Sequence, residues 1–232
     1  MCRISIIIPV SNEAPLIAGS LTSLQAWRVH DHEVIVVDGN STDATATIAA
    51  PLCDQVIRSS KGRAIQMNAG AGAAHGDVFV FLHVDTELPA NADAELHNLA
   101  QEHGEFWGRF DVRLDARPVI YRAIEALMNW RSRISGIATG DQAIFVSRTL
   151  FERSGGFPPI ALMEDIALCA NLRREVAPTC FRSRVKTSAR RWQRDGVVKT
   201  IIKMWWLRAA FFFGVAPERL RASYDRLDPA DV

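Results

Sequence analysis

Residues 78–85 of this chain read VFVFLHVD, a run of β-branched and aromatic residues that ends in a carboxylate. Gly76-Asp77 precede the run, and Thr86-Glu87-Leu88-Pro89 follow it. A continuous apolar run bounded by turn residues is typical of a strand buried on both faces of a parallel sheet. Polar groups at the carboxyl end of such a strand border the crevice in which open α/β sheets bind ligands. We therefore predict that Asp85 ends a central strand at a binding site.

Asp85 has two interpretations. A single Asp after a strand is commonly a turn residue or the N-cap of the next helix. The same position also suits a divalent cation, because Mg²⁺ and Mn²⁺ take oxygen ligands together with substrate phosphates. The segments upstream favour the second interpretation.

Two upstream segments repeat this design. Residues 33–38 (EVIVVD) and 4–10 (ISIIIPV) are apolar runs followed by polar residues, and helix-like segments follow at about 14–24, 41–50 and 90–101. This β-α-β-α-β alternation predicts a parallel sheet with right-handed crossovers. The strand ends would then place several carboxylates along one edge: Glu13, Asp38, Asp43 and Asp85. Such an edge repels phosphate unless a metal, or cations such as Lys61 and Arg63, offset the charge.

Composition indicates a soluble enzyme of one domain. The 232 residues suffice for one α/β domain with a large core, and 48% hydrophobic with 23% charged residues is ordinary for globular proteins. A formal net charge of +1 predicts no nucleic-acid partner. The four cysteines lack metal-ligand spacing and indicate reduced thiols in a cytoplasmic protein. Met1 leads almost directly into the first strand, so no signal peptide is expected, and no run reaches ~20 apolar residues.

The middle of the chain contains weaker signals. Arg63 opens a helix-like segment rich in small residues, where a guanidinium binds phosphate or is simply exposed to solvent. Residues 105–114 predict an antiparallel or edge strand, in which Arg109 and Asp111 form a charged ladder exposed to solvent. After a helix over 118–133, Gly140-Asp141 is either an acceptor-pocket wall or a tight turn before the strand 143–146.

Glu164-Asp165 begins another helix-like segment. Carboxylates in a first helical turn interact favourably with the helix dipole by about 0.3–1 kcal/mol, and that alone explains an isolated pair. The alternative is a catalytic role, which spacing alone does not distinguish.

Eight blocks of this sequence resemble glycosyltransferase family 2, which has the nucleotide-diphospho-sugar transferase (GT-A) fold. The first three are SIIIPVSNE at 5–13, VVDGNSTD at 36–43 and FLHVD at 81–85. The others are KGRAIQMNAG at 61–70, WGRFD at 107–111, TGDQAIFV at 139–146, MEDI at 163–166 and SARRW at 188–192, which resemble a bacterial radical-SAM/selenodomain-associated transferase 2 subgroup. The resemblance covers about residues 4–224 and implies a single domain over 1–232. Its parts would be a nucleotide-sugar half (1–100), an acceptor and catalytic half (101–195) and a C-terminal amphipathic helix and tail (196–232).

The resemblance implies an inverting, metal-dependent transfer of a sugar from a UDP- or GDP-linked donor to a hydroxyl acceptor, for which a lipid-linked molecule is one candidate. Asp165 would be the general base, and Asp85 would bind Mn²⁺ or Mg²⁺ with His83 as a second candidate ligand. The donor-binding residues it implies are Pro9, Glu13, Asp38, Asp43, Arg63, Asn68 and Asp85. Those on the acceptor or phosphate side are Asp141, Glu164, Arg191 and Trp192.

The sequence departs from the family pattern at three positions. His83 replaces the first carboxylate of the usual metal motif, Asn40 replaces a glycine, and Ser188 stands where processive synthases have Gln. Asn accepts a left-handed backbone, so the turn at Asn40 should persist. The missing Gln indicates a single addition and no polymerisation.

Two other function classes remain. A sugar-phosphate nucleotidyltransferase would need a Gly-rich basic loop after the first strand, whereas residues 11–15 read SNEAP. An inactive sugar-nucleotide binding module is the second alternative, although Asp38, Asp85 and Asp165 are all present.

Residues 196–214 predict an amphipathic helix that is apolar and aromatic, with Lys199, Lys203 and Arg208 interrupting it. Trp205 and Trp206 are residue types of the membrane interface. The helix would lie on a membrane surface, pack on the catalytic domain, or form a homodimer interface.

Overall fold

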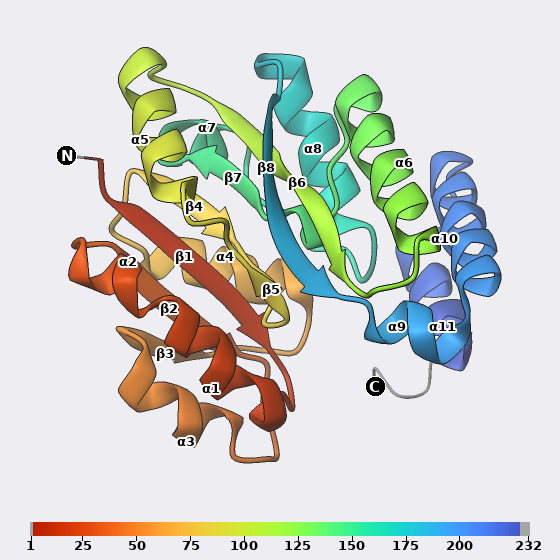
Figure 1. The fold of residues 1–232 in the computed structure, drawn as a ribbon, viewed down its shortest axis with the longest axis horizontal. Coiled ribbons are helices and arrows are strands. Elements are labelled where there is room, and N and C mark those ends of the chain that lie inside the picture. Colours follow the sequence, from red (N-terminus) through yellow and green to blue (C-terminus); the bar gives the residue numbers. More distant parts are fainter. Residues whose placement is uncertain (1, 228–232) are drawn as a thin grey trace.

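One mixed sheet of eight strands forms the centre of the described residues, 2–227, in the computed structural model (Figure 1). The strand order is β3-β2-β1-β4-β7-β6-β8-β5. The strands are β1 Ile4–Val10, β2 Glu33–Asp38, β3 Gln55–Arg58, β4 Val78–Phe81, β5 Thr86–Glu87, β6 Trp107–Asp115, β7 Ile144–Ser147 and β8 Thr179–Ser188. The helices are α1 Ala14–Ser23, α2 Gln25–Val29, α3 Thr45–Ala49, α4 Arg63–Ala73, α5 Ala92–Glu102, α6 Ile120–Ser135, α7 Arg148–Arg153, α8 Glu164–Glu175, α9 Arg190–Asp195, α10 Val197–Phe212 and α11 Pro217–Leu227. Two short 3₁₀ turns are η1 Ala50–Leu52 and η2 Gly140–Gln142.

The predicted parallel half of the sheet is confirmed. β1 pairs in parallel with β2 on one side and with β4 on the other, and β2 pairs in parallel with β3. Successive side chains of β1 face opposite helical layers: Ile6 and Ile8 join the cluster that contains Ile17, whereas Ile7 joins the cluster that contains Met67. Because both faces are covered, the strands read as continuous apolar runs.

β4 is shorter than predicted. It ends at Phe81, and residues 82–85 form a loop that leads to β5. Leu82 and Val84 are nevertheless buried in the core cluster on the α1 face. The apolar run therefore continues past the strand because the loop is itself buried, and the prediction that Asp85 directly ends a strand is wrong.

β6 lies in the interior of the sheet, between antiparallel β7 and parallel β8. It is antiparallel to β7, as expected, but it is not an edge strand. The solvent-exposed ladder is wrong, because Arg109 and Asp111 are buried and contact each other. Arg109 also donates to the carbonyl of Asn129, and Arg133 lies 2.9 Å from Asp111, so both charges have partners inside the protein.

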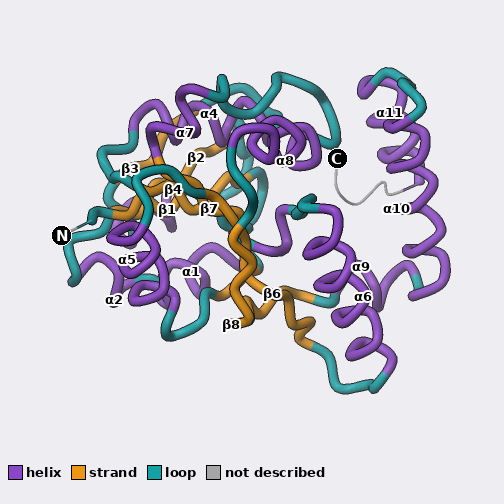
Figure 2. The backbone as a smooth tube through the Cα atoms, turned by 90° about the horizontal axis from the view of Figure 1, so that it is seen from above, coloured by secondary structure: helices purple, strands orange, loops and turns teal. Residues whose placement is uncertain are grey.

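α10 and α11 lie on the outer flank of the molecule, away from the central sheet (Figure 2). Leu207 of α10 is fully buried with Met163, Leu220 and Tyr224. One face of the predicted amphipathic helix thus packs on the rest of the protein at the start of α8. The other face exposes large side chains: Val198, Ile202, Trp205, Trp206 and Phe212.

α6 exposes a second apolar stripe of Ile120, Leu127, Trp130 and Ile134. No helix among residues 2–227 is both long enough and apolar enough to span a bilayer.

Candidate active site

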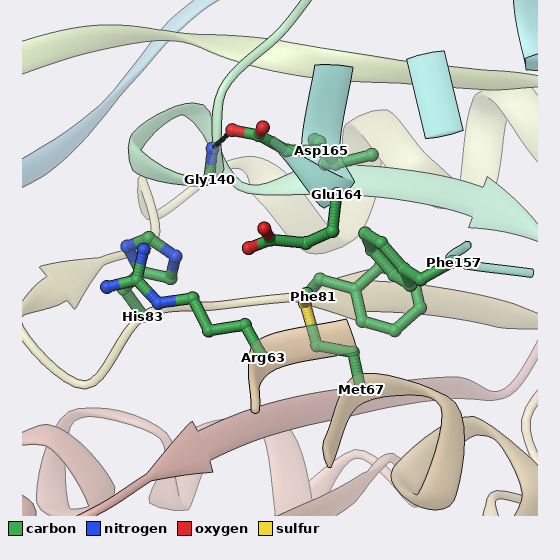
Figure 3. Close-up of a pocket in the computed structure, with 9 residues that line it drawn as sticks. Arg63, Met67, Phe81, His83, Gly140, Phe157, Glu164 and Asp165 are labelled. Carbon is green, nitrogen blue, oxygen red and sulfur yellow. Dashed lines mark hydrogen bonds between the residues drawn. The ribbon is translucent and has the colours of Figure 1, made fainter. Parts of the chain in front are cut away.

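A narrow pocket opens at the carboxyl edge of β4, between α4 and α8 (Figure 3). Its cavity volume is about 20 Å³, so a substrate larger than a water molecule would bind at its mouth. The lining residues come from five separate segments: Arg63, Met67, Phe81, His83, Gly140, Ile144, Phe157, Glu164 and Asp165. The structure therefore unites four predicted site residues, namely Arg63, His83, Glu164 and Asp165.

Asp165 lies in the first turn of α8 and is held by two backbone amides. The N–H of Gly140 donates to Oδ2 at 3.1 Å and the N–H of Ile166 donates to Oδ1 at 2.7 Å. Met163, just before α8, has a left-handed backbone with φ 70°. Such a conformation in a non-glycine residue costs on the order of 1–3 kcal/mol and persists where packing requires it. Here the packing comes from Leu207 of α10.

The Glu164 carboxylate points into the space beside Arg63 and His83 (Figure 3). Burial raises the pKa of Glu164, and the neighbouring Asp165 carboxylate raises it further. The charges of Arg63 and His83 act in the opposite direction but do not cancel the effect. Glu164 therefore stays protonated to a higher pH than an ordinary glutamate. Asp165, which accepts two backbone N–H groups, is the better hydrogen-bonded carboxylate of the pair.

His83 packs closely against the turn η2. A Cβ atom on Gly140 would lie 2.3 Å from His83 Nε2, so this approach requires glycine. His83 Nδ1 lies 3.4 Å from a carboxylate oxygen of Asp141. Burial opposes ionisation of Asp141, but the hydrogen bond and charge of His83, with the charges of Arg191 and Arg63, lower its pKa well below the usual range. Asp141 is thus a stable anion beside the pocket.

Three predicted residues, Glu13, Asp38 and Asp43, lie where two loops meet at the ends of β1 and β2. Asp38 accepts hydrogen bonds from the backbone N–H and the hydroxyl of Ser41. Asp43 accepts from the N–H of Ala14 at 3.1 Å and of Thr45 at 3.0 Å, and the Thr45 hydroxyl lowers the pKa of Asp43. The Thr45 hydroxyl in turn accepts the N–H of Glu13 at 2.8 Å. These bonds tie the two loops together into one polar rim.

The backbone turn of this rim is as expected from the sequence. Asn40 has φ 61°, the left-handed conformation predicted for it. Pro9 lies within β1, paired with Val37, and is half-buried below the rim.

Asp85 faces a different space from Asp165. It lines a groove of about 330 Å³ between α1 and β8, and its side chain is 27% exposed. Its oxygens lie 3.9 Å from Arg190 Nη2 and 3.4 Å from Thr86 Oγ1. Both contacts are too long for strong hydrogen bonds, so lone pairs remain for a cation. This carboxylate fits a metal that completes its shell with water and substrate phosphate, but His83 and Asp85 do not line the same pocket.

Three other predicted residues have defined partners. The Asn68 amide donates to the carbonyl of Phe157 at 2.8 Å and accepts its N–H at 2.9 Å, so it shapes a pocket wall. Trp192 packs against the small cluster around Tyr121. The Arg191 guanidinium lies 5.6 Å from the ring centre of Tyr224, and its charge acts on Asp141.

A cluster of His32, Asp93 and His97 was not predicted. Its ligand-type atoms lie within 4.8 Å of one another, and Asp93 Oδ1 lies 2.9 Å from His32 Nε2 and 2.8 Å from His97 Nδ1. His32 Nδ1 accepts the N–H of Ile4 at 3.2 Å, so a neutral ring carries its proton on Nε2. That nitrogen then donates to Asp93 and has no lone pair for a metal. The cluster is a hydrogen-bonded brace at the amino end of β1.

The sequence gives little sign of Arg131 in α6 and Arg208 in α10 as site residues. Both are half-buried, and the charge of Asp165 acts on both. In the sequence, Arg208 looks like one of several cations on an exposed helix. Arg131 is marked only as a cation among apolar helical residues.

The curled α/β sheet, with a basic and acidic pocket at the carboxyl edge of its parallel half, defines a nucleotide-diphospho-sugar transferase (GT-A) fold. S. aureus TarS in complex with UDP superposes with a TM-score of 0.65 at 19% identity, covering 80% of this chain and 60% of that chain. PcManGT, a mannosyltransferase of Pyrobaculum calidifontis in complex with GDP-Man and Mn²⁺, superposes with a TM-score of 0.63 at 21% identity, covering 99% and 70%. Both likenesses confirm the predicted fold.

The chain belongs to glycosyl transferase family 2, whose model matches residues 5–177. An uncharacterized glycosyltransferase of Nostoc sp. is 31% identical over 90 residues, which is 36% of this chain and 28% of that protein. The chain thus matches under a third of the length of this curated relative. The predicted family is confirmed, whereas the predicted subgroup stays a prediction.

Proposed function

We propose that this protein is an inverting glycosyltransferase that moves a sugar from a UDP- or GDP-linked donor to a hydroxyl acceptor with Mn²⁺ or Mg²⁺. The observation that carries the proposal is the pocket that joins Arg63 and His83 to the carboxylates of Glu164 and Asp165, within a family 2 domain. TarS was solved with UDP, PcManGT with GDP-Man and Mn²⁺, and these neighbours support the donor class and the metal.

The donor would lie along the carboxyl edge of the parallel strands. Asp38, Asp43 and Glu13 form the polar rim beyond β1 and β2, and their carboxylates suit the N–H groups of a base or the ribose hydroxyls. The diphosphate would extend from this rim towards β4. Arg63 and Arg191, whose charges both act on Asp141, supply cations on that path.

Asp85 would hold the metal. A bound Mn²⁺ or Mg²⁺ would neutralise charge on the departing diphosphate. The long contacts of the Asp85 oxygens to Arg190 and Thr86 leave them available for this role. His83 faces Asp141 and Gly140, so we assign it to positioning Asp141 and not to the metal shell.

Asp165 would remove the proton from the acceptor hydroxyl as that oxygen attacks the anomeric carbon. The Gly140 and Ile166 amides hold its carboxylate in one orientation, which general-base catalysis requires. Attack opposite to the leaving diphosphate inverts the anomeric centre. Glu164, whose pKa is raised, would remain protonated beside Asp165 and would donate a hydrogen bond within the pocket.

Donor binding tests the proposal directly. UDP-, GDP- and other nucleotide-sugars are titrated calorimetrically into the wild type with Mn²⁺, and again with EDTA. Binding that requires the metal and disappears in Asp85→Asn, with unchanged thermal unfolding, is the expected result. Equal affinity in the mutant, or affinity indifferent to EDTA, refutes the metal role. A product that retains the donor's anomeric configuration refutes inversion.

The same reaction mixture separates the two alternatives. Free nucleoside diphosphate indicates a transferase, pyrophosphate indicates a nucleotidyltransferase, and neither indicates a binding module. The loop after β1 contains no glycine and no basic residue, which favours the transferase over the nucleotidyltransferase.

We also propose that the outward stripes of α6 and α10 rest on a membrane surface. Trp130, Trp205 and Trp206 are 64%, 71% and 51% exposed, a large aromatic content for a surface facing water. Exposed Lys199 supplies positive charge beside them, which suits anionic lipid headgroups. A homodimer through this surface is the competing outcome.

A further inference from the structure

Arg131 and Arg208 are two cations from neighbouring helices, α6 and α10, and the proposed transfer does not use either of them. The structure leaves a buried N–H of each without a hydrogen-bond partner: Nη2 of Arg131 and Nε of Arg208. The Arg131 guanidinium makes one long hydrogen bond, 3.4 Å to the carbonyl of Ile137. Buried guanidinium N–H groups are normally satisfied, and neither Arg131 nor Arg208 has a carboxylate within ion-pair distance among the described residues, so each retains a donor for an anionic partner.

Two sets of contacts link α6 and α10 to the segment around Asp165. Gln142 of η2 donates to Ser132 at 3.0 Å, next to Arg131 in α6, while Gly140 of the same turn donates to Asp165. On the other side, Leu207 packs against Met163, so Arg208 follows a residue that contacts the start of α8. These contacts bring α6 and α10 close to the start of α8, and the charge of Asp165 acts on both guanidinium groups.

The electrostatics agree with this placement. Burial and the charge of Arg208 lower the pKa of Arg131 to about 10, against the opposing charge of Asp165. Burial also lowers the pKa of Arg208, against the charges of Asp165 and Asp141. Asp141 already faces His83, Arg191 and Arg63. Asp165 is the carboxylate whose charge acts on both guanidinium groups, whereas Asp141 acts on Arg208 and also faces three other cations.

We propose that Arg131 and Arg208 bind an anionic group of the acceptor, a phosphate or a carboxylate, beside the hydroxyl that Asp165 would deprotonate, which rests on the proposed function. Two guanidinium groups provide the forked, charge-assisted hydrogen bonds that such groups prefer. The proposed path of the donor diphosphate has its own cations, Arg63 and Arg191, whose charges act on Asp141. The acceptor class is therefore a hydroxyl compound with a nearby negative charge.

Inorganic phosphate is the probe for this site. It is titrated calorimetrically into the full chain in metal-free buffer, and UDP and GDP are titrated separately with Mg²⁺. Arg131→Gln and Arg208→Gln should each weaken phosphate binding by at least about tenfold, the effect of losing a hydrogen bond to a charged group. Nucleotide affinity should stay unchanged. Arg174→Gln, an exposed arginine on α8, is the matched control and should change neither affinity.

Three results overturn the proposal: no phosphate binding by the wild type, phosphate affinity unchanged in both variants, or an equal loss of nucleotide affinity. The last result assigns the pair to the donor. Failure of the proposed function gives a different result: nucleotides then do not bind the wild type, while phosphate still does. If the Gln variants do not fold, phosphate should protect Arg131 and Arg208 of the wild type from phenylglyoxal, as mapped by mass spectrometry. Modification that phosphate does not slow refutes the site.

A vesicle experiment distinguishes the two possible sources of the anion, a lipid headgroup and a water-soluble acceptor. Phosphatidylcholine vesicles with and without phosphatidic acid are sedimented with the wild type and with Arg208→Gln. Retention that requires phosphatidic acid, is competed by inorganic phosphate and is lost in the variant identifies a lipid phosphate. Phosphate binding without such retention identifies a water-soluble acceptor.

Discussion

Replacing Leu207 with alanine should release α10 and α11 from the domain without unfolding the sheet. Leu207 is fully buried in a cluster with Met163, Leu220 and Tyr224, and it belongs to neither of the two large core clusters. Burial of each such side chain contributes about 1.5–3 kcal/mol, so the four contribute about 6–12 kcal/mol before the ordering of the helices is subtracted. A buried Leu→Ala change removes about 2–5 kcal/mol, a large part of that total.

Hydrogen exchange measures the effect segment by segment. A loss of about 2 kcal/mol raises the open population about 30-fold, so amides of α10 should exchange about 30 times faster while those of β1 and β2 are unchanged. Because Leu207 supports the strained backbone at Met163, the start of α8 should also loosen, and kcat should fall while donor affinity is retained. Leu127→Ala in α6, where the side chain is 61% exposed, is the control and should change none of these.

Two results would refute this reasoning. Uniformly faster exchange across the sheet would show that α10 is an integral part of the core. Unchanged exchange in α10 would show that the cluster around Leu207 does not hold the helix.

Three further predictions concern the site and the surface. Asp165→Asn should lower kcat at least about 10²-fold with donor affinity nearly unchanged, in single-turnover and calorimetric measurements; a smaller loss would contradict a general base. Because the folded-state pKa of Glu164 is raised above 4.5, the wild type loses stability as the pH rises from about that value. Glu164→Gln should therefore raise the Tm at neutral pH and leave it unchanged below pH 4.5, and the opposite pH trend in thermal scans would contradict the raised pKa. Flotation with anionic liposomes should be lost in Trp205→Ser/Trp206→Ser, whereas no flotation together with a stable dimer would favour a subunit interface.

The parallel half of the fold was predictable because its strands are apolar on both faces. β1 and β2 have no polar alternation, and the helices between them follow recognisable turn residues. β3 and β8 were missed because Gln55–Arg58 is short and half-exposed, and because Arg182 and Arg184 of β8 face solvent. The residue pattern of such a short or polar strand is the same as that of a loop, so the sequence does not distinguish the two.

The site was predictable only in part. The carboxylates after β1 and β2 are local features, and so are Glu164 and Asp165 at a helix start. The approach of His83 to Gly140 depends on tertiary packing, and so does the position of Arg208, which in sequence is one of three cations spaced along an apolar helix. The separation of Asp85 from Asp165 arises because β4 ends four residues early, which periodicity does not reveal.

The pairing of β5 with β8 affects the order in which this protein can complete its fold. β5 begins five residues after β4 ends, yet it lies at the far end of the sheet order, where Thr86 Oγ1 donates to Thr187 Oγ1 at 2.9 Å across 101 residues of sequence. The N–H of Ser188 also donates to the carbonyl of Asp85 at 3.2 Å. During synthesis, β1 to β4 can therefore pair well before the turn around Asp85 has its strand partner, and contacts of such long sequence separation form slowly. A nascent chain with a paired β1 to β4 would thus keep an unfinished turn around Asp85 until β8 leaves the ribosome.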